Sequence, residues 1–474
     1  MTRDDTGPLQ RESGLIRSLS PKQVVMMAIG SAIGTGLFLG STLAISLAGP
    51  AVIISYVIGA AVALLVAWAL MEMSSAIPTA GSFGVYAEQY LNPWAGFTIR
   101  WFYWLAQVVA IGGEATAAGI YAQFWFPHIP LAYFVIAFSL ALIAVNASPV
   151  KNFGTFEYWF AMIKVAAIIL FIVLGVGVIF WGIGGSPAPG LANMTVHGGF
   201  MPHGIKGVWL AMLVVIFSYY GVEVVSVTSG EAQNPEHSLP RATRSMVLRL
   251  TLFYVLGIAI VIAVVPWTQA GVHSGILHSP FVLVFQHAHI PFAASIMNFV
   301  VLTAALSSMN TDLYLTTRML FSLARSGYAP QFLGQLSKHA IPVQALAVST
   351  GGIAIAAILS VTAASGAYFT LFGISIFGAI VVWILILATH IRFRRIRQVQ
   401  GLPPSPVLMP GHPWSEAIGI ILLIGILLTA FPDGMPIVFE AGIPTLVVVT
   451  GLYYVVRKRL ALAGSATLDP PPSS

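Results

Sequence analysis

Charged residues are scarce in this chain of 474 residues, and only 8% of them are Asp, Glu, Lys or Arg. A soluble globular domain carries about 25%. Hydrophobic residues make up 58% of the chain, and apolar runs of roughly 20 residues, enough to cross a hydrocarbon core of ~30 Å, recur along most of it. This composition excludes a soluble globular protein and predicts an all-α membrane protein.

Cysteine is absent altogether, which excludes a disulfide framework and any thiolate metal site. The sequence also lacks a Gly-x-x-x-x-Gly-Lys-Ser/Thr loop, so ATP hydrolysis is not expected. Four histidines gather in one segment, but their spacing matches no strong metal-ligand pattern; they are His273, His278, His287 and His289. We therefore expect no cofactor and no metal, and we attribute the net charge of +6 to basic loops rather than to a nucleic-acid partner.

Hydropathy predicts twelve transmembrane helices. Their ranges are 22–47, 51–77, 95–126, 130–147, 156–184, 207–229, 246–267, 291–317, 344–363, 369–391, 414–432 and 436–456. With the N-terminus in the cytoplasm, all of the 21 Lys and Arg residues except Lys164 and Lys206 fall inside the cell, as the positive-inside rule requires. The sequence therefore predicts an inner-membrane protein with cytoplasmic tails at residues 1–21 and 457–474.

Two of the predicted spans contain matching interruptions. The first is the glycine-rich run from Gly30 to Gly36, and the second is the run from Ser218 to Glu223 in the sixth span. Because five spans separate them, the two halves enter the membrane from opposite sides, which is typical of an inverted repeat with a binding site near the midplane. We expect repeats at 22–184 and 207–391, with two further helices at 414–456. The alternative is that the glycines only allow close helix packing.

Four segments of the sequence match one family as a set. They are Ile29–Phe38, Asn152–Val165, Phe217–Pro240 and Arg318–Gly327. The chain resembles the amino acid–polyamine–organocation (APC) transporters, specifically the bacterial permeases for aromatic amino acids, proline or γ-aminobutyrate. The resemblance implies a LeuT-like fold of five plus five helices with the first and sixth broken. One departure is Ser31, where many of these permeases have a second glycine.

Broken helices offer backbone groups that suit an amino acid. Free N–H groups and a helix N-terminus in span 1 favour a carboxylate, and carbonyls near the end of span 6 favour an ammonium group. The substrate-binding candidates are Ser31, Ala32, Gly34, Thr35, Gly36, Glu114, Phe217, Ser218, Tyr219, Gly221 and Asn310. The aromatic residues Phe217, Tyr219 and Tyr220 are expected to cover the site as a gate, or alternatively to face lipid and neighbouring helices.

Ionisable residues inside spans are costly and mark functional positions. Lys164 lies about two turns inside span 5, where an ammonium must be paired or neutral, and burial could remove its proton. In proton-coupled relatives a span-5 lysine occupies the place of a coupling ion, so the resemblance implies that Lys164 couples transport to protons. The alternative is a permanent cap on broken-helix carbonyls. Glu114 and Glu223 are the further proton-coupling candidates, and Glu223 could instead serve as a partner for the broken backbone.

Polar stripes follow two other spans. In span 3, Gln107 and Tyr121 each lie one heptad from Glu114, on nearly the same face. Span 8 repeats the pattern with hydroxyl and amide side chains at spacings of four, three and four, which more often join helices than bind substrates. Its members are Thr303, Ser307, Asn310 and Tyr314.

These features predict a proton-coupled secondary transporter that imports amino acids by alternating access, and not an enzyme or a channel. A channel would line a polar pore, and an enzyme would cluster its reactive groups. With Glu114 and Glu223 the only carboxylates expected near the midplane and Lys164 offsetting one, a neutral or aromatic amino acid is predicted. An amino-acid sensor without transport and an amino-acid exchanger stay open as alternatives, as does the oligomeric state.

Overall fold

The computed structural model describes residues 14–34, 36–183, 187–270, 280–287, 291–362, 365–431 and 435–466. All the named elements within these ranges are helices. The longer ones are α1 (Pro21–Ala32), α3 (Val52–Ala76), α5 (Pro93–Gln123), α6 (Leu131–Asn146), α7 (Val150–Trp181), α8 (Gly204–Tyr219), α10 (Pro235–Val264), α13 (Ala293–Arg325), α14 (Val343–Thr362), α15 (Ser365–Val399), α16 (Trp414–Thr429) and α17 (Ile437–Ala466).

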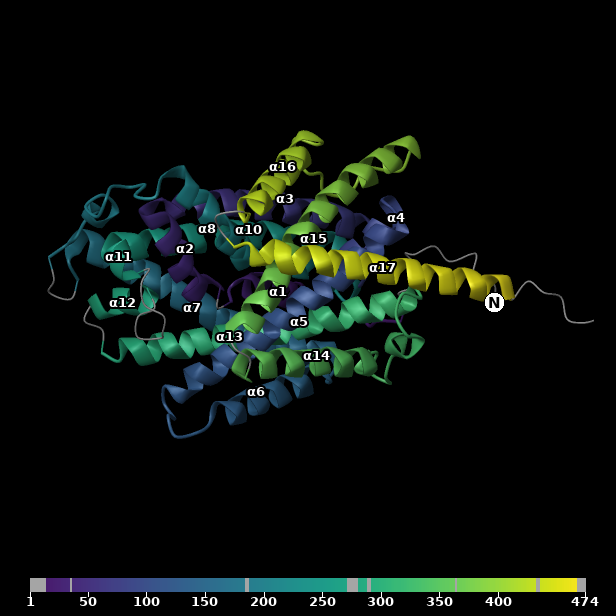
Figure 1. Ribbon diagram of the computed structural model, residues 1–474, viewed down its shortest axis with the longest axis horizontal. Coiled ribbons are helices and arrows are strands. Elements are labelled where there is room, and N and C mark those ends of the chain that lie inside the picture. Colours follow the sequence, from purple (N-terminus) through teal and green to yellow (C-terminus); the bar gives the residue numbers. More distant parts are fainter. Residues whose placement is uncertain are drawn as a thin grey trace, which may run out of the picture.

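Short helical elements join these. They are η1 (Gly36–Gly40), α2 (Ser41–Ala48), η2 (Gly49–Ala51), α4 (Ser82–Tyr90), η3 (Ala192–Met194), α9 (Val224–Val227), η4 (Thr228–Gly230), α11 (Trp267–Ala270), α12 (Pro280–His287) and η6 (Gln331–Gly334). Helices α13, α14 and α17 run roughly along the long axis of the molecule, whereas α15 and α16 are inclined to it; α11 and α12 lie at the left end and the last turns of α17 at the right end (Figure 1).

A helix lies at each of the twelve ranges predicted to span the membrane. Seven helical stretches among the described residues are long and apolar enough to cross one, and four shorter helices are apolar as well. The chain is therefore an integral membrane protein built of helices. The twelve-span layout stays a prediction, because length and composition alone support seven.

Several helices extend beyond the apolar ranges that predicted them. α7 begins at Val150 rather than at 156, α13 continues to Arg325 and α15 to Val399. Backbone hydrogen bonds continue a helix through polar residues, whereas hydropathy marks only the apolar part. Hydropathy also gave no sign of α4, a short helix that follows α3.

Local sequence explains where the helices start. Ser20 and Gln23 form a capping box at the start of α1, with Pro21 in the first turn. The Asn92 side chain accepts a hydrogen bond from Ala95 N at 2.8 Å and caps α5, where Pro93 follows. Both helices thus begin where proline and a polar cap satisfy the first free N–H groups.

Two groups of helices pack around the centre of the molecule. α5 packs against α4, α13, α14 and α15, while α1 packs against α7, α10 and α13. α13 belongs to both groups, so its side chains reach both the broken first helix and α5. This position places the polar stripe of α13 beside the candidate site.

The segment before α1 is fixed to the segment after η4. Leu19 N donates to Glu231 O at 3.0 Å, and Gln233 N donates to Leu19 O at 2.9 Å. Nearby, Arg318 of α13 donates two hydrogen bonds to the Glu231 carboxylate, at 3.2 and 2.9 Å. The guanidinium also lies over the Tyr314 ring, 3.9 Å from its centroid. The ion pair is buried, with 3% and 2% of the two side chains exposed.

Replacing Glu231 with glutamine should destabilise the protein, because Arg318 would then be a buried charge without its counter-ion. Breaking such a pair costs about 3–5 kcal/mol. We expect a lower midpoint of thermal unfolding for Glu231→Gln in detergent, measured by fluorescence-detected size exclusion after heating. Glu236→Gln, which changes an exposed carboxylate in the first turn of α10, outside the predicted spans, should leave the midpoint within about a degree because surface charges contribute little. Equal midpoints for the two variants would contradict the assignment.

Candidate functional site

The first helix is interrupted at its centre. α1 ends at Ala32, and Ile33 has φ −93° and ψ 83°, outside the helical region. The chain resumes as the π-helical element η1 at Gly36 and continues into α2. Thr35 and the side chain of Ala32 lie outside the described part of the chain. The interruption leaves the last carbonyl groups of α1 without helical partners.

The sixth predicted span is interrupted as well. α8 ends at Tyr219, and Tyr220 is extended with ψ 133°. Gly221 follows with φ +117°, a conformation that glycine adopts without strain. The Glu223 carboxylate accepts hydrogen bonds from Gly221 N at 2.8 Å and from the Trp383 indole of α15. Glu223 thus accepts a hydrogen bond from a backbone N–H group of the interruption in which it lies. This is the alternative role that the sequence suggested for it.

The two interruptions contact each other directly. Ser31 Oγ donates to Gly221 O at 3.2 Å, and Ser218 Oγ donates to Gly36 O at 3.2 Å. A Cβ atom on Gly36 would lie 3.2 Å from Ser218 Cα, so the backbones approach closely. Four of the predicted site residues are therefore neighbours, and the serine that departs from the family pattern joins the two breaks.

Lys164 lies at the carbonyl end of α1. Its Nζ donates to Gly30 O, to Ile33 O at 2.9 Å and to Ser307 Oγ of α13 at 2.8 Å, and its side chain is fully buried. A positive charge at this position also suits the negative end of the α1 dipole. Both hypotheses for Lys164, a titrating group and a permanent cap, place the lysine at these carbonyls.

Glu157 is a buried carboxylate that the sequence reasoning missed. It accepts hydrogen bonds from Ser307 Oγ and from Asn310 Nδ2, the latter at 3.2 Å. Ser307 therefore links the Lys164 ammonium to the Glu157 carboxylate. The span was predicted to start at 156, so Glu157 was placed at the membrane edge. α7 begins at Val150 instead, and the seven-residue spacing from Glu157 to Lys164, two helical turns, was the signal that could have revealed the pair.

The polar stripe of α13 joins helices. Asn310 donates to Glu157 of α7 and accepts from Asn146 Nδ2 of α6 at 2.9 Å. Tyr314 donates to Glu231, and Thr303 Oγ1 donates to a carbonyl of its own helix. The contacts of Asn310 thus go to neighbouring helices rather than to the two breaks, so they favour a structural role over the predicted substrate contact.

Glu114 lies beside the break in α1. A Cβ atom on Gly34 would be 3.4 Å from Glu114 Oε1 and 2.6 Å from Ser308 Oγ. Gln107, expected on the same face as Glu114, donates instead to Asp312 Oδ1 at 3.1 Å. Asp312 is buried and lies within the range predicted for span 8, where a count of charges could have identified it.

The expectation that Glu114 and Glu223 are the only carboxylates near the centre is wrong, because Glu157 and Asp312 are buried there too. Hydrogen bonds from the chain reach Glu157 from Ser307 and Asn310, Glu223 from Gly221 and Trp383, and Asp312 from Gln107. The charge balance at the site therefore depends on these contacts and not on Lys164 alone.

The predicted aromatic gate residues contact neighbouring helices. Tyr219 stacks on Tyr254 of α10 with ring centroids 4.6 Å apart, and its hydroxyl donates to Tyr56 O of α3 at 3.2 Å. Phe217 is half-buried and packs against the hydrophobic core. Tyr220 packs against Tyr103 of α5, with ring centroids 5.5 Å apart. Tyr219 is thus part of the core, and Tyr220 is the aromatic residue that lies at the break itself.

Known proteins are similar to this chain over most of its length. The sequence model described as amino acid permease matches residues 23–451. The γ-aminobutyric acid permease of Bacillus subtilis (strain 168) is 40% identical over 452 residues, covering 95% of each chain. The uncharacterized amino acid permease YtnA of the same organism is 40% identical over 427 residues, 90% of this chain and 91% of YtnA.

A third relative is the aromatic amino acid transport protein AroP of Escherichia coli (strain K12). It is 37% identical over 459 residues, which are 96% of this chain and 99% of AroP. A match of this extent covers both interruptions and the helices that hold Lys164 and Glu157. The chain belongs to the amino acid permease family.

Proposed function

We propose that this chain is a proton-coupled secondary transporter that imports neutral or aromatic amino acids by alternating access. Its family makes it an amino-acid transporter and not an enzyme. The observation that carries the proposal is the buried Lys164 ammonium on the carbonyl end of broken α1, linked through Ser307 to a buried carboxylate. A proton moving on or off this group changes the contacts of the interrupted helix.

We also propose the layout that the sequence predicted: twelve spans in a bacterial inner membrane, with two inverted repeats at 22–184 and 207–391. A helix at each predicted range and an interruption at the first and the sixth support it. The distribution of basic residues supports cytoplasmic termini. Residues 414–456 then form two helices outside the repeats.

The substrate would bind between the two breaks. Its carboxylate would meet N–H groups where η1 begins at Gly36, and its ammonium group would meet carbonyls at the end of α8. Gly34 supports this placement, because it brings the backbone of the break so close to Ser308 and Glu114 that a Cβ atom there would lie 2.6 Å from Ser308 Oγ. Recognition by backbone leaves the choice among amino acids to surrounding side chains.

Proton coupling follows from the number of donors on Lys164. An ammonium group has three N–H donors, and Nζ has three acceptors, namely Gly30 O, Ile33 O and Ser307 Oγ. Loss of the proton leaves two donors for three acceptors, so the cap on α1 weakens. We propose that Lys164 takes up a proton facing outward and releases it facing inward, with Glu114 and Glu223 as further titrating groups.

Replacing Gly34 with leucine should abolish substrate binding while the protein stays folded. The side chain would clash with Ser308 and block backbone approach to the substrate carboxylate. Hydrogen bonds to a charged group contribute about 1.5–3 kcal/mol each, so losing two of them predicts an affinity loss of about a hundredfold or more. Binding to purified protein by scintillation proximity would measure it.

The matched control is Gly351→Leu in α14, where a Cβ atom would meet nothing within 4 Å. This variant should bind as the unchanged protein does. Normal affinity in a well-expressed Gly34→Leu variant would show that the break in α1 is not the binding site.

Substrate charge provides a second test. Because Glu157, Glu223 and Asp312 already accept hydrogen bonds from the chain, we expect neutral or aromatic amino acids to bind better than lysine or arginine by about a hundredfold. An unneutralised buried charge costs ~2.5–3.5 kcal/mol. Competition of unlabelled amino acids against one labelled substrate in proteoliposomes measures the order. Lysine or arginine outcompeting every neutral amino acid would contradict this proposal.

Lys164→Ala should abolish uphill uptake driven by a pH gradient, and any residual exchange should lose its pH dependence. Lys164→Arg should fail as well, because a guanidinium stays charged and cannot release a proton. Uptake into proteoliposomes with only ΔpH imposed measures both, and Lys206→Ala, which changes an exposed lysine at the start of α8, is the control.

Other outcomes of the uptake experiment would assign a different role to Lys164 or to the whole protein. Accumulation by Lys164→Arg would make the lysine a structural cap and move the coupling proton to Glu114 or Glu223. Substrate binding by the unchanged protein without any uptake would indicate a sensor. Exchange without accumulation would indicate an exchanger.

A further inference from the structure

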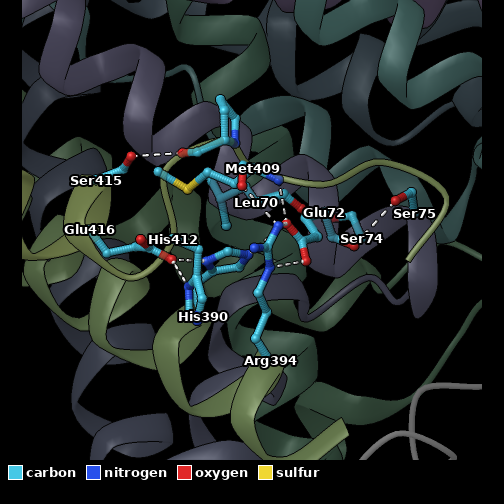
Figure 2. A network of polar contacts seen from close by, with 11 residues as sticks. Leu70, Glu72, Ser74, Ser75, His390, Arg394, Met409, His412, Ser415 and Glu416 are labelled. Atoms are coloured by element: carbon cyan, nitrogen blue, oxygen red, sulfur yellow. Dashed lines mark hydrogen bonds and ion pairs between the residues drawn. The ribbon is translucent and has the colours of Figure 1, made fainter. Parts of the chain in front are cut away.

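A second polar cluster lies away from the two breaks, where α3, α15 and α16 meet (Figure 2). Glu72 belongs to α3, His390 and Arg394 lie one turn apart on α15, and Glu416 lies in the first turn of α16. His412 precedes Glu416 by four residues, in the segment that connects α15 to α16. The transport proposal uses none of these side chains.

Glu72 holds one side of His390 in place. The Glu72 carboxylate accepts two hydrogen bonds from Arg394, at 2.6 and 2.5 Å, and one from Met409 N at 2.6 Å. His390 Nε2 lies 3.1 Å from Glu72 Oε2. The Nε2 side of the His390 ring therefore faces a carboxylate that an arginine holds in place.

Two imidazole nitrogens converge on one oxygen at the other side of the ring. His390 Nδ1 lies 2.7 Å and His412 Nδ1 2.5 Å from Glu416 Oε1. The side chains of His390 and Glu416 are fully buried, whereas 22% of the His412 side chain is exposed. The second oxygen, Glu416 Oε2, is buried and has no hydrogen-bond partner among the described residues.

The segment that carries His412 is held by hydrogen bonds within its own turn. Ser415 Oγ donates to Pro410 O at 2.7 Å, and Ser415 N donates to Gly411 O at 3.0 Å. Gly411 has φ +74°, and a Cβ atom there would lie 2.4 Å from Ser415 Oγ. This turn is closed around a glycine, and it directs His412 toward Glu416 (Figure 2).

Two imidazoles and one carboxylate are a donor set that zinc prefers, with a water completing four ligands. One ligand atom from each of His390, His412 and Glu416 lies within 4.8 Å of the others. Tetrahedral zinc separates its ligand atoms by about 3.4 Å, so each histidine nitrogen, now 2.7 or 2.5 Å from Glu416 Oε1, needs to move away from that oxygen by less than about 1 Å. Glu416 can also present its free oxygen.

The surroundings of His390 match those of a metal-bound histidine. Such a histidine donates its other ring N–H to a carboxylate, which fixes the tautomer and the ring orientation. Here Nδ1 faces the ligand position, and Nε2 lies 3.1 Å from Glu72 Oε2, at ion-pair distance but outside hydrogen-bond geometry. The alternative is an imidazolium that forms ion pairs with Glu72 and Glu416 at once, which needs no ion but leaves Glu416 Oε2 without a partner among the described residues.

We propose that His390, His412 and Glu416 bind a divalent transition-metal ion of the zinc type, with Glu72 orienting His390 from behind. The ion joins the end of α15 to the start of α16 and, through Glu72, to α3. The exposed edge of His412 gives the ion its route from water and the place for a water ligand. On the proposed topology this edge faces the cytoplasm.

The test uses the purified full-length chain, freed of metal with EDTA and titrated with Zn²⁺ by calorimetry. We expect saturable binding, and His412→Ala should lower the stoichiometry by one or weaken this site by more than about a hundredfold, since even indirect partners contribute 10–100-fold. His339→Ala, at an exposed histidine before α14, is the matched control and should bind as the unchanged protein does. The midpoint of thermal unfolding should rise with Zn²⁺ in the unchanged protein and in the control only.

Cobalt provides a readout that does not need a variant. Because the chain has no cysteine, Co²⁺ in this site should give the visible absorption of a tetrahedral nitrogen and oxygen site without a thiolate charge-transfer band, and Zn²⁺ should displace it. If His412→Ala does not fold, His412→Asn, which keeps a polar side chain but ligates poorly, takes its place. Equal zinc stoichiometry and affinity in the His412 variant and the control, or no tetrahedral cobalt spectrum, would overturn the proposal in favour of a hydrogen-bonded imidazolium.

Discussion

The structure depends on how the free carbonyl groups of the interrupted first helix are satisfied. In a membrane each unsatisfied backbone group costs several kcal/mol, and no water in the lipid core can compensate for it. Lys164 meets this requirement by donating to the carbonyl groups at the end of α1, whereas Ser31 of α1 donates to a carbonyl of the opposite break. The packing of α7 and α13 around α1 follows, because both helices supply side chains to this one position.

The second break is satisfied in a different way. Glu223 folds back on its own backbone and receives the indole N–H of Trp383, so α8 and α9 depend on α15. One break therefore has a cationic partner and the other an anionic one. This difference gives the two interruptions opposite polarity, and the proposed binding of a zwitterion between them rests on it.

Sequence reasoning identified the helices and the two breaks because apolar length and clustered glycines act locally. It missed Glu157 because hydropathy placed the start of α7 six residues late. A carboxylate at the edge of a span reaches the membrane interface and so does not indicate a functional position. Asp312 could have been predicted as a buried carboxylate, because it lies inside a predicted span. The roles of Asn310 and Tyr219 could not be predicted, because their partners, Asn146 and Tyr254, are distant in sequence and only packing brings them together.

The pairing of Leu19 with residues 231 and 233 has a consequence for how the first helix can move. The two bonds join main-chain atoms, so their strength does not depend on which side chains occupy these positions. The start of α1 can tilt only by breaking both bonds or by carrying the segment after η4 along with it. In the second case the start of α1 and the segment after η4 move together as one rigid unit, because hydrogen bonds between peptide groups hold them to each other.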